Sequence, residues 1–281
     1  EGLVRGCSCR GTAGFAHVSC LAEQAKILFA EAEENNLDAK VLNERWGRWY
    51  ACSLCEQKYH GVVACALGWA CWKAYLGRPE ANQIRGLAMN LLGNGLHEAE
   101  RHADALTVRE AELAMERRLG ASERNMLVAQ SNLASTYQQL GQLEQAMLLK
   151  RDVYSGHLKL SGEEHEHTIH AASNYAHGLI TLQRYAEAKS LLRKMIPVSR
   201  RFLGETHEIT LTMRKIYARA LYEDAGATLG DLREAVTTLE DTARIARRVF
   251  GVTHPHTSAI EEDLQDAQAA LRARETPSSP S

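Results

Sequence analysis

The chain has 281 residues, and its 33 basic and 35 acidic side chains give a net charge of −2. This balance gives no electrostatic reason to expect nucleic acid or an anionic membrane as a partner. Few prolines and phenylalanines among abundant alanine, leucine, glutamate and arginine favour helices over sheets. The best candidate for a membrane span, at 61–72, has twelve uncharged residues. A span needs about twenty, so we expect a buried helix there and no membrane span.

Six residues of the types that bind zinc lie in short pairs near the N-terminus. The pairs are Cys7-x-Cys9, His17-x-x-Cys20 and Cys52-x-x-Cys55. Thiolates and imidazoles in closely spaced pairs are the ligands that tetrahedral Zn²⁺ prefers, and two pairs close one site. An odd total of seven cysteines, most of them in such pairs, favours a metal site in a reducing compartment over a disulfide framework. We therefore expect bound zinc and a cytoplasmic or nuclear location.

Between Cys20 and Cys52 the sequence predicts two helical pieces, at 21–33 and 37–46. A further helix is expected at about 61–78, and it carries the two other cysteines, Cys65 and Cys71. The two cysteines are six positions apart in the expected helix, which places them about 240° apart around its axis. They cannot both face one metal ion, so we expect them to pack as small apolar side chains.

From about residue 81 to 272 the sequence is helical and repetitive. Glycines at 120, 162, 204 and 251 recur at intervals of 42, 42 and 47 residues. The sequence that begins at the last three of these glycines also recurs, as GEEHEHT (162–168), GETHEIT (204–210) and GVTHPHT (251–257). Units of this length are typical of helical hairpins that stack into a solenoid, because one hairpin cannot bury its apolar face alone.

Small residues recur where the two helices of each predicted hairpin would cross. The pairs are Ala134 with Ala146, Ala176 with Ala188, and Ala218 with Ala235. The domain prediction is a ligand-rich module at 1–60, a connecting helix at 61–80, and about four hairpins plus a capping helix at 81–272. The Pro- and Ser-rich end, 273–281, is predicted to be disordered.

The histidines at 165, 207 and 254 also recur once per hairpin. Neighbouring copies would lie at least a helix spacing of about 8–10 Å apart, which one metal ion cannot bridge. We therefore predict that they cap or pack at the hairpin junctions, near Thr168, Thr210 and Thr257 at the helix starts.

The G-x-x-H-x-x-T loops and the NLASTY segment at 132–137 resemble the 42-residue tetratricopeptide repeats of kinesin light chain and its relatives. The resemblance covers roughly residues 82–272. It implies an all-α helical-hairpin solenoid, a protein-interaction scaffold that holds a protein or peptide client in its groove.

In such arrays the first helix of each hairpin lines the concave groove. Asn132 and Asn174 occupy equivalent first-helix positions, so the resemblance implies that they bind a peptide backbone. Further polar residues that could join them are Ser131, Gln138, Ser173, His177 and Arg214. The alternative is a solvated polar face or hydrogen bonds between helices, and the sequence leaves both open.

The spacing of the N-terminal ligands, from Cys7-Ser-Cys9 through His17-x-x-Cys20-Leu21 to the final C-x-x-C, resembles the RING-CH (RING-variant) zinc finger. By that resemblance, Cys7, Cys9, Cys52 and Cys55 form one complete site. His17 and Cys20 form half of a second site, whose other cysteines we expect upstream, so we interpret Glu1 as a start inside the finger. The 31 residues between Cys20 and Cys52 are longer than usual for this family. PHD fingers share the ligand order and tolerate longer gaps, so a PHD-like reader of modified tails is the minority interpretation.

The RING-CH resemblance implies an E3 ubiquitin-ligase subunit that recruits a ubiquitin-conjugating enzyme, while the repeats select the client. Such a finger acts by proximity and orientation, so no residue of this chain is expected to be catalytic. Leu54, Trp46 and Trp49 are candidate contacts for the enzyme. For the tryptophans the alternative is packing against the zinc module. A second hypothesis is a non-enzymatic adaptor with a structural zinc module and peptide-binding repeats.

Overall fold

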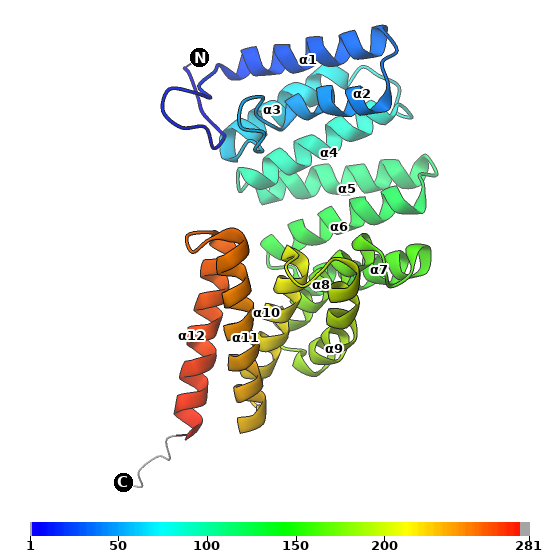
Figure 1. Ribbon diagram of the computed structural model, residues 1–281. Helices are drawn as coiled ribbons and strands as arrows, with labels where there is room; N and C mark the ends of the chain where they lie inside the picture. The colour runs from blue at the N-terminus through cyan, green and yellow to red at the C-terminus, as the bar shows by residue number, and fades with distance from the viewer. Residues whose placement is uncertain (1, 276–281) are drawn as a thin grey trace. The chain divides into compact units, whose positions relative to one another are not determined.

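The computed structural model describes residues 2–275 and is helical through most of that range (Figure 1). Among these residues, β-structure is limited to two isolated bridges. The chain divides into two compact units, Glu1–Gln142 and Leu143–Ser281, called unit 1 and unit 2. The predicted all-α class is therefore confirmed.

Unit 1 contains two loops near its N-terminal end and a series of helices. In chain order its helices are α1 (Val18–Glu34), α2 (Ala39–Trp46), the 3₁₀ helix η1 (Gly47–Trp49), α3 (Gly61–Tyr75), α4 (Gln83–Glu98), α5 (His102–Arg118) and α6 (Glu123–Gln139). Helix α1 packs on α2 and α3, and from α3 to α6 each helix packs against the next (Figure 1). The two helical pieces predicted between Cys20 and Cys52 correspond to α1 and α2.

Polar side chains begin several helices of unit 1. Asp38 caps α2 by accepting two backbone N–H groups of its first turn, at 2.9 and 3.0 Å. Asn82 and Ser122 cap α4 and α6 in the same way. Each cap satisfies N–H groups that have no partner inside the helix. Before α2 the chain reverses at Asn36, whose φ of 50° is a left-handed conformation that asparagine tolerates.

Helix α3 lies against α4 at two glycines. A Cβ added at Gly95 would lie 2.5 Å from the carbonyl oxygen of Ala64. One added at Gly68 would lie 3.0 Å from the Cα of Leu92. The sequence predicts a connecting helix at 61–80, but α3 does more than connect, because its backbone packs directly on the first helix of the repeat region.

Four aromatic rings join α1, α2, η1 and α3. Phe29, Trp46, Trp49 and Tyr75 lie with neighbouring centroids 5.1–6.0 Å apart, three of the four pairs edge to face. Such pairs contribute about 0.5–1.5 kcal/mol each beyond the burial of their area. Ala88 of α4 belongs to the same cluster, so the N-terminal segment and the first long helices share one core.

Unit 2 is a run of antiparallel helices. They are α7 (Leu143–Ser161), α8 (Glu166–Thr181), α9 (Tyr185–Phe202), α10 (Glu208–Tyr222), α11 (Leu229–Phe250) and α12 (Pro255–Glu275). Each packs against the next, and α10 also contacts α8 and α12 (Figure 1). This alternation is the packing of stacked helical hairpins, as the repeat predicts.

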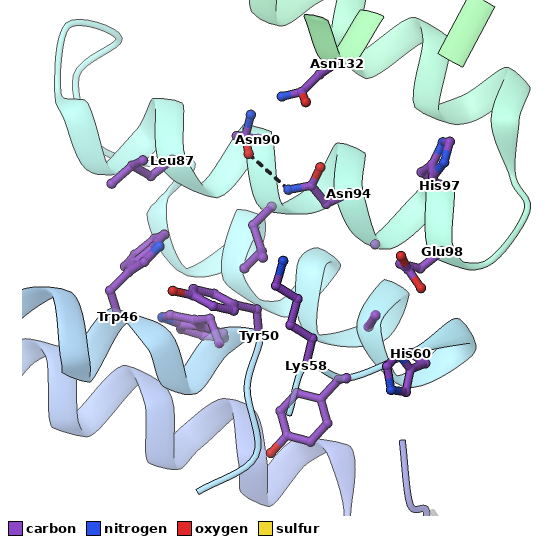
Figure 2. A pocket seen from close by; sticks show the side chains of 15 residues that line it. Trp46, Tyr50, Lys58, His60, Leu87, Asn90, Asn94, His97, Glu98 and Asn132 are labelled. Carbon is purple, nitrogen blue, oxygen red and sulfur yellow. Dashed lines mark hydrogen bonds between the residues drawn. The ribbon is translucent and has the colours of Figure 1, made fainter. Parts of the chain in front are cut away.

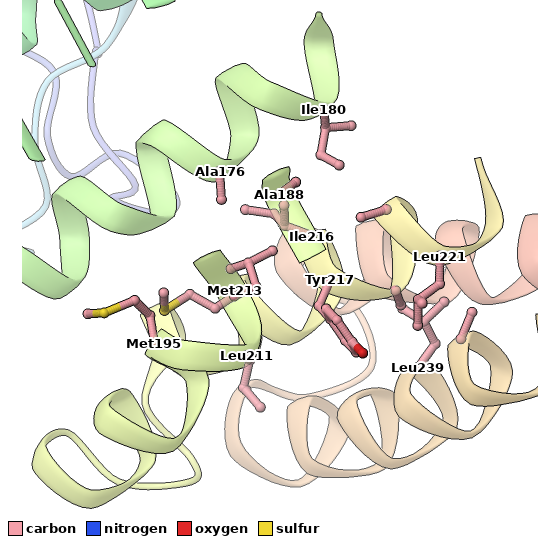
Figure 3. Packing of buried hydrophobic residues seen from close by; sticks show 14 of the residues in the cluster. Ala176, Ile180, Ala188, Met195, Leu211, Met213, Ile216, Tyr217, Leu221 and Leu239 are labelled. Carbon is pink, nitrogen blue, oxygen red and sulfur yellow. The ribbon is translucent and has the colours of Figure 1, made fainter. Parts of the chain in front are cut away.

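The core of unit 2 combines small residues at the helix crossings with large aliphatic residues between them. Ala176, Ala188, Ala218 and Ala235, predicted at the crossings, are fully buried. Figure 3 shows large side chains of the same cluster, including Met195, Leu211, Met213, Ile216, Leu221 and Leu239. Close packing of this kind requires small side chains where backbones approach.

The recurring histidines cap helices. His165 and His207 are the N-cap residues of α8 and α10, and His254 precedes α12. In each case Nδ1 accepts the backbone N–H two residues further on, at 3.2, 3.2 and 3.1 Å respectively. The predicted capping role is confirmed.

The backbone conformation explains why glycine recurs at these positions. Gly162, Gly204 and Gly251 have φ values of 79°, 98° and 90°, which residues with a Cβ rarely adopt. The carbonyl oxygen of Gly251 also accepts a 2.9 Å hydrogen bond from the buried Thr257 hydroxyl. Glycine, histidine and threonine together therefore form the junction between successive hairpins.

The last helix, α12, closes unit 2. Ile260 and Ala267 are fully buried on one face, as predicted for a capping helix. The helix extends to Glu275, so residues 273–275 of the predicted disordered tail are helical. The rest of that tail lies outside the described residues. Within residues 2–275, no helix is long and apolar enough to cross a membrane.

Candidate metal centre

Four of the six predicted ligands come together in unit 1. The Sγ atoms of Cys7, Cys9, Cys52 and Cys55 all lie within 4.8 Å of one another. Those of Cys9 and Cys52 are 3.7 Å apart. Four thiolates about 2.3 Å from a tetrahedral Zn²⁺ have their sulfurs about 3.8 Å apart. The cluster therefore fits a zinc ion of the Cys₄ type.

The first loop delivers Cys7 and Cys9. An antiparallel bridge between Val4 and Ala16 closes this loop, with N–H···O distances of 2.9 and 3.0 Å. Inside the loop Gly14 has a φ of 77°, and a Cβ there would lie 2.6 Å from that of Cys9. Glycine is needed at this position so that the loop can fold over the thiols.

The second loop delivers Cys52 and Cys55 between η1 and α3. An antiparallel bridge between Ala51 and Lys58 closes it. Just beyond, the backbone N–H of His60 donates a 2.8 Å hydrogen bond to a carbonyl oxygen of the first loop. The two pairs of thiols therefore face each other across backbone hydrogen bonds.

The four thiols are not electrostatically equivalent. Burial raises the pKa of Cys52, but backbone N–H donors of its own turn and then the thiols of the first loop lower it, to about 7. One of these donors, Leu54 N–H, lies 3.4 Å from the Cys52 Sγ. Burial and the neighbouring thiols raise the pKa of Cys9 to about 12. A bound cation would favour the thiolate form of all four.

His17 and Cys20 do not join this cluster. The His17 Nδ1 and the exposed Cys20 Sγ lie 3.9 Å apart at the start of α1. Within residues 2–275, the four clustered cysteines are the only group of three or more closely placed metal-ligand side chains. His17 and Cys20 thus remain a two-ligand pair, and the predicted second site stays a prediction.

Cys65 and Cys71 lie in two different apolar clusters. Cys65 packs with Leu92 and Leu96, whereas Cys71 packs with the aromatic rings of α1 and η1. Burial raises the pKa of Cys71 well above its usual value. Both side chains are apolar core residues, as the helical spacing predicts.

The three predicted contacts for a conjugating enzyme have different environments. Leu54 is 69% exposed on the second loop, beside Cys55. Trp46 is half-buried, and Trp49 is only 1% exposed. Trp49 therefore has no surface to offer a partner, and its prediction as a contact is corrected. Its ring belongs to the aromatic core, 5.9 Å from that of Tyr75.

The predicted groove residues of unit 1 lie on α6. Ser131, Asn132 and Gln138 are all half-buried there. Asn132 lines a hollow of about 680 Å³, so its side chain is accessible to a ligand.

The predicted groove residues of unit 2 make contacts with other side chains. Ser173 is buried, and Asn174 lies 3.3 Å from the Nδ1 of His170 on the same helix. Arg214 forms a 2.7 Å ion pair with Glu205. Burial, followed by nearby cationic side chains, lowers the pKa of His177 to about 4. Asn174 is thus engaged within α8 and Arg214 with the loop before α10, and peptide binding by these residues stays a prediction.

Sequence reasoning missed a polar network beside the hollow. The buried Arg109 and Glu112 form a 2.8 Å ion pair on α5, and Glu112 accepts a 2.9 Å hydrogen bond from Asn90 of α4. Arg109 also donates to Asn94. Asn94 in turn donates to Asn90 at 3.1 Å (Figure 2). The sequence contains the signal, because both asparagines lie four residues apart on one face of a helix.

The comparisons with known proteins address the repeats. A family model described as tetratricopeptide repeat matches residues 126–167 and 227–256. No curated protein sequence matches significantly. Among solved structures, a kinesin light chain of Podosopora anserina with nearly identical TPR-like repeats is 24% identical. The match covers 68% of this chain and 89% of that chain, with a TM-score of 0.57.

Two further structures share the fold. BtubC (BKLC) from P. vanneervenii is 15% identical over 78% of this chain and 94% of its own, with a TM-score of 0.57. A Rap protein complexed with Competence and Sporulation Factor is 14% identical. That match covers 90% of this chain and 66% of the Rap chain, with a TM-score of 0.53. With the packing described above, these matches define the fold class: the chain is a tetratricopeptide-repeat solenoid. Its fold is that of the kinesin-light-chain repeat structures.

Proposed function

We propose that this protein is a zinc-folded interaction scaffold whose N-terminal finger, residues 2–60, binds one Zn²⁺ through Cys7, Cys9, Cys52 and Cys55. The observation that carries the proposal is the convergence of four thiols from two loops, in a geometry that fits a tetrahedral ion. Four protein ligands leave no open position, so the ion would hold the loops together and would not act on a substrate.

The finer proposal is an E3 ubiquitin-ligase subunit. The order and spacing of the finger ligands support it, and Leu54 presents an exposed apolar side chain beside the cluster. The finger would bind a ubiquitin-conjugating enzyme, and the repeats would hold the client nearby. Rate enhancement would come from proximity, with no acid, base or nucleophile supplied by this chain.

A client bound by the repeats has support from a fold neighbour, since the Rap protein was solved in complex with Competence and Sporulation Factor. In this chain Asn132 is the predicted groove residue with an accessible hollow beside it. We therefore place the client in unit 1.

The second candidate is a non-enzymatic adaptor in which zinc only folds the module. The burial of Trp49 favours it, because this removes one of the three predicted contacts for a conjugating enzyme. The adaptor keeps the zinc site and the peptide-binding repeats and lacks enzyme recruitment.

Zinc binding is tested by metal analysis of the full chain purified without chelator. We expect one zinc per chain, and loss of that zinc in Cys52→Ala. Cys20→Ser is the matched control, because Cys20 lies outside the cluster and should leave the zinc content unchanged. Zinc-free wild-type protein, or equal loss in both variants, would contradict the proposal.

Ligase activity is tested by ubiquitin-chain formation with the full chain and a panel of conjugating enzymes. The ligase proposal predicts chains that disappear in Leu54→Asp while zinc is retained. Leu148→Asp is the control, because Leu148 is 52% exposed but lies in unit 2. If no enzyme of the panel forms chains, the adaptor remains and the ligase proposal is rejected.

A further inference from the structure

The finger loops and the repeat helices of unit 1 share one hollow. Its volume is about 680 Å³. Trp46, Tyr50 and Lys58 line it from the finger side, and α4 and α6 line it from the repeat side (Figure 2). Ala64 of α3 also lines it, between the two sides.

The finger side of the hollow presents aromatic rings, and the repeat side presents Leu87 and three amides. Trp46 and Tyr50 face Leu87, while Asn90, Asn94 and Asn132 present side-chain amides above them (Figure 2). Amides donate and accept hydrogen bonds, so they suit the main chain of an extended peptide. Asn90 and Asn94 are held in place by hydrogen bonds to each other and to the buried Arg109–Glu112 pair, which lowers the entropy cost of using them. Each amide keeps one further N–H and one oxygen lone pair for a ligand.

Lys58 supplies an unused positive charge. Its side chain extends from the finger toward Asn94 (Figure 2), and within the described residues its Nζ has no ion-pair or hydrogen-bond partner. Glu98 lies at the far side of the hollow, between His60 and His97 (Figure 2). The position beside Lys58 therefore favours an acidic side chain.

A second hollow, of about 500 Å³, adjoins the first along α4, since Leu87 and Asn90 line both. Its charged residues are acidic: Glu80, Glu112 and Glu116. Glu80 is paired with Arg118 and Glu112 with Arg109, whereas Glu116 has no such partner among the described residues. Burial and the charge of Glu112 raise the pKa of Glu116, as expected of a carboxylate that lacks a cation.

Helix α4 gives the distance between the two charged positions. Lys58 points toward Asn94, and the Glu116 carboxylate lies over Gly86, where an added Cβ would be 3.5 Å from its Oε1. Gly86 and Asn94 are eight positions apart on α4, which corresponds to a rise of about 12 Å. An extended peptide advances about 3.3 Å per residue, so the same length corresponds to about four residues.

We propose that unit 1 binds an extended peptide along α4, with an acidic side chain at Lys58 and a basic side chain at Glu116, about four residues apart. An apolar side chain between them packs on the aromatic wall. The occupant is thus a mixed-charge linear segment of a partner protein. The inference rests on the proposed peptide-binding role of the repeats and is independent of ligase activity.

The test is fluorescence anisotropy of the zinc-loaded full chain with short labelled peptides. All share one neutral sequence with a central leucine and carry two charged positions four residues apart. The charges are Glu with Lys in both orders, Glu with Glu, Lys with Lys, or Gln with Gln. We expect one mixed-charge order to bind about tenfold more tightly than every other peptide.

Charge reversal in the protein should then reverse the preference. Lys58→Glu makes both ends acidic and should select the doubly basic peptide, whereas Glu116→Lys should select the doubly acidic one. Lys73→Glu and Glu123→Lys are matched controls at exposed positions outside both hollows, and they should keep the wild-type preference.

The outcomes separate this inference from the scaffold function. If peptides bind but the reversals do not change their ranking, the charge order is wrong and the scaffold role stands. If no peptide of the panel binds, the peptide site in unit 1 is rejected. Zinc content measured on the same samples shows whether the finger is folded in each variant.

Discussion

The finger and unit 2 reach a fixed structure by different means. The cluster around the finger cysteines contains four buried residues, whereas the core of unit 2 contains twenty-four. Unit 2 can therefore be stabilised by apolar burial alone, at roughly 25 cal/mol per Å². The finger loops cannot, so cross-links through a metal would supply what the small core lacks.

The largest expected effect is removal of zinc. A chelator, or Cys52→Ala, should release both finger loops and open the wall of the 680 Å³ hollow. Structural zinc in small modules contributes on the order of 10 kcal/mol, more than the loops' own contacts. Hydrogen exchange should show lost protection at residues 2–17 and 50–60 and none in unit 2.

All four tryptophans, at 46, 49, 69 and 72, lie in unit 1, so their fluorescence gives a second readout of the same change. The proposed difference between the two regions would be contradicted if the finger kept its protection from hydrogen exchange without metal. It would also be contradicted if unit 2 lost protection as well.

The next effect concerns the apolar core of unit 2. Leu239→Ala should lower its free energy of unfolding by about 2–5 kcal/mol, because Leu239 is fully buried and its loss leaves a cavity. Urea unfolding followed by pulsed hydrogen exchange measures this. Leu148→Ala, at a 52% exposed position, should cost far less, and neither change should alter zinc content.

A smaller effect is expected at the contact between α3 and α4. Gly95→Ala places a methyl group 2.5 Å from the Ala64 carbonyl oxygen and should destabilise unit 1 by about 1–3 kcal/mol. Tryptophan fluorescence in urea is the measurement. Gly77→Ala is the control, since nothing lies within 4 Å of its added Cβ. Equal midpoints for both variants would mean that the finger does not depend on this contact.

The smallest effect is a pH dependence within unit 2. Burial lowers the pKa of His177 from 6.5 to about 4, so between these values the unfolded chain binds a proton that the folded chain does not. The contribution of neutral His177 to the free energy of unfolding is therefore fully present above pH 6.5. It should be lost on acidification through this window, by on the order of 1 kcal/mol. His177→Gln should flatten the unit 2 urea midpoints between pH 7 and pH 5. An unchanged slope would assign the acid sensitivity to other groups.

The repeats could be predicted from the sequence because each unit carries its own local signals. The glycine, histidine and threonine of the loops and the alanines at the crossings recur at fixed spacing, and each has one structural role. The spacing of the ligand pairs marked the six candidate zinc ligands, because metal-ligand spacing is a strong local signal. The resemblance to the RING-CH finger then implied which four of them meet, although Cys7 and Cys52 are 45 positions apart.

What the sequence could not predict depends on contacts between distant segments. Trp49 is buried because α1, α3 and α4 close over it, and no periodicity near it indicates that. The hollow at Lys58 arises from the packing of α3 on α4 through Gly68 and Gly95. Such glycines are visible in the sequence, but the partner backbone that they approach is not.

The most direct test of the account is zinc K-edge X-ray absorption on the full chain. The account predicts one zinc per chain with four sulfur ligands at about 2.3 Å and no nitrogen or oxygen in the shell. A shell that includes imidazole nitrogen or water, or protein that binds no zinc, would contradict it.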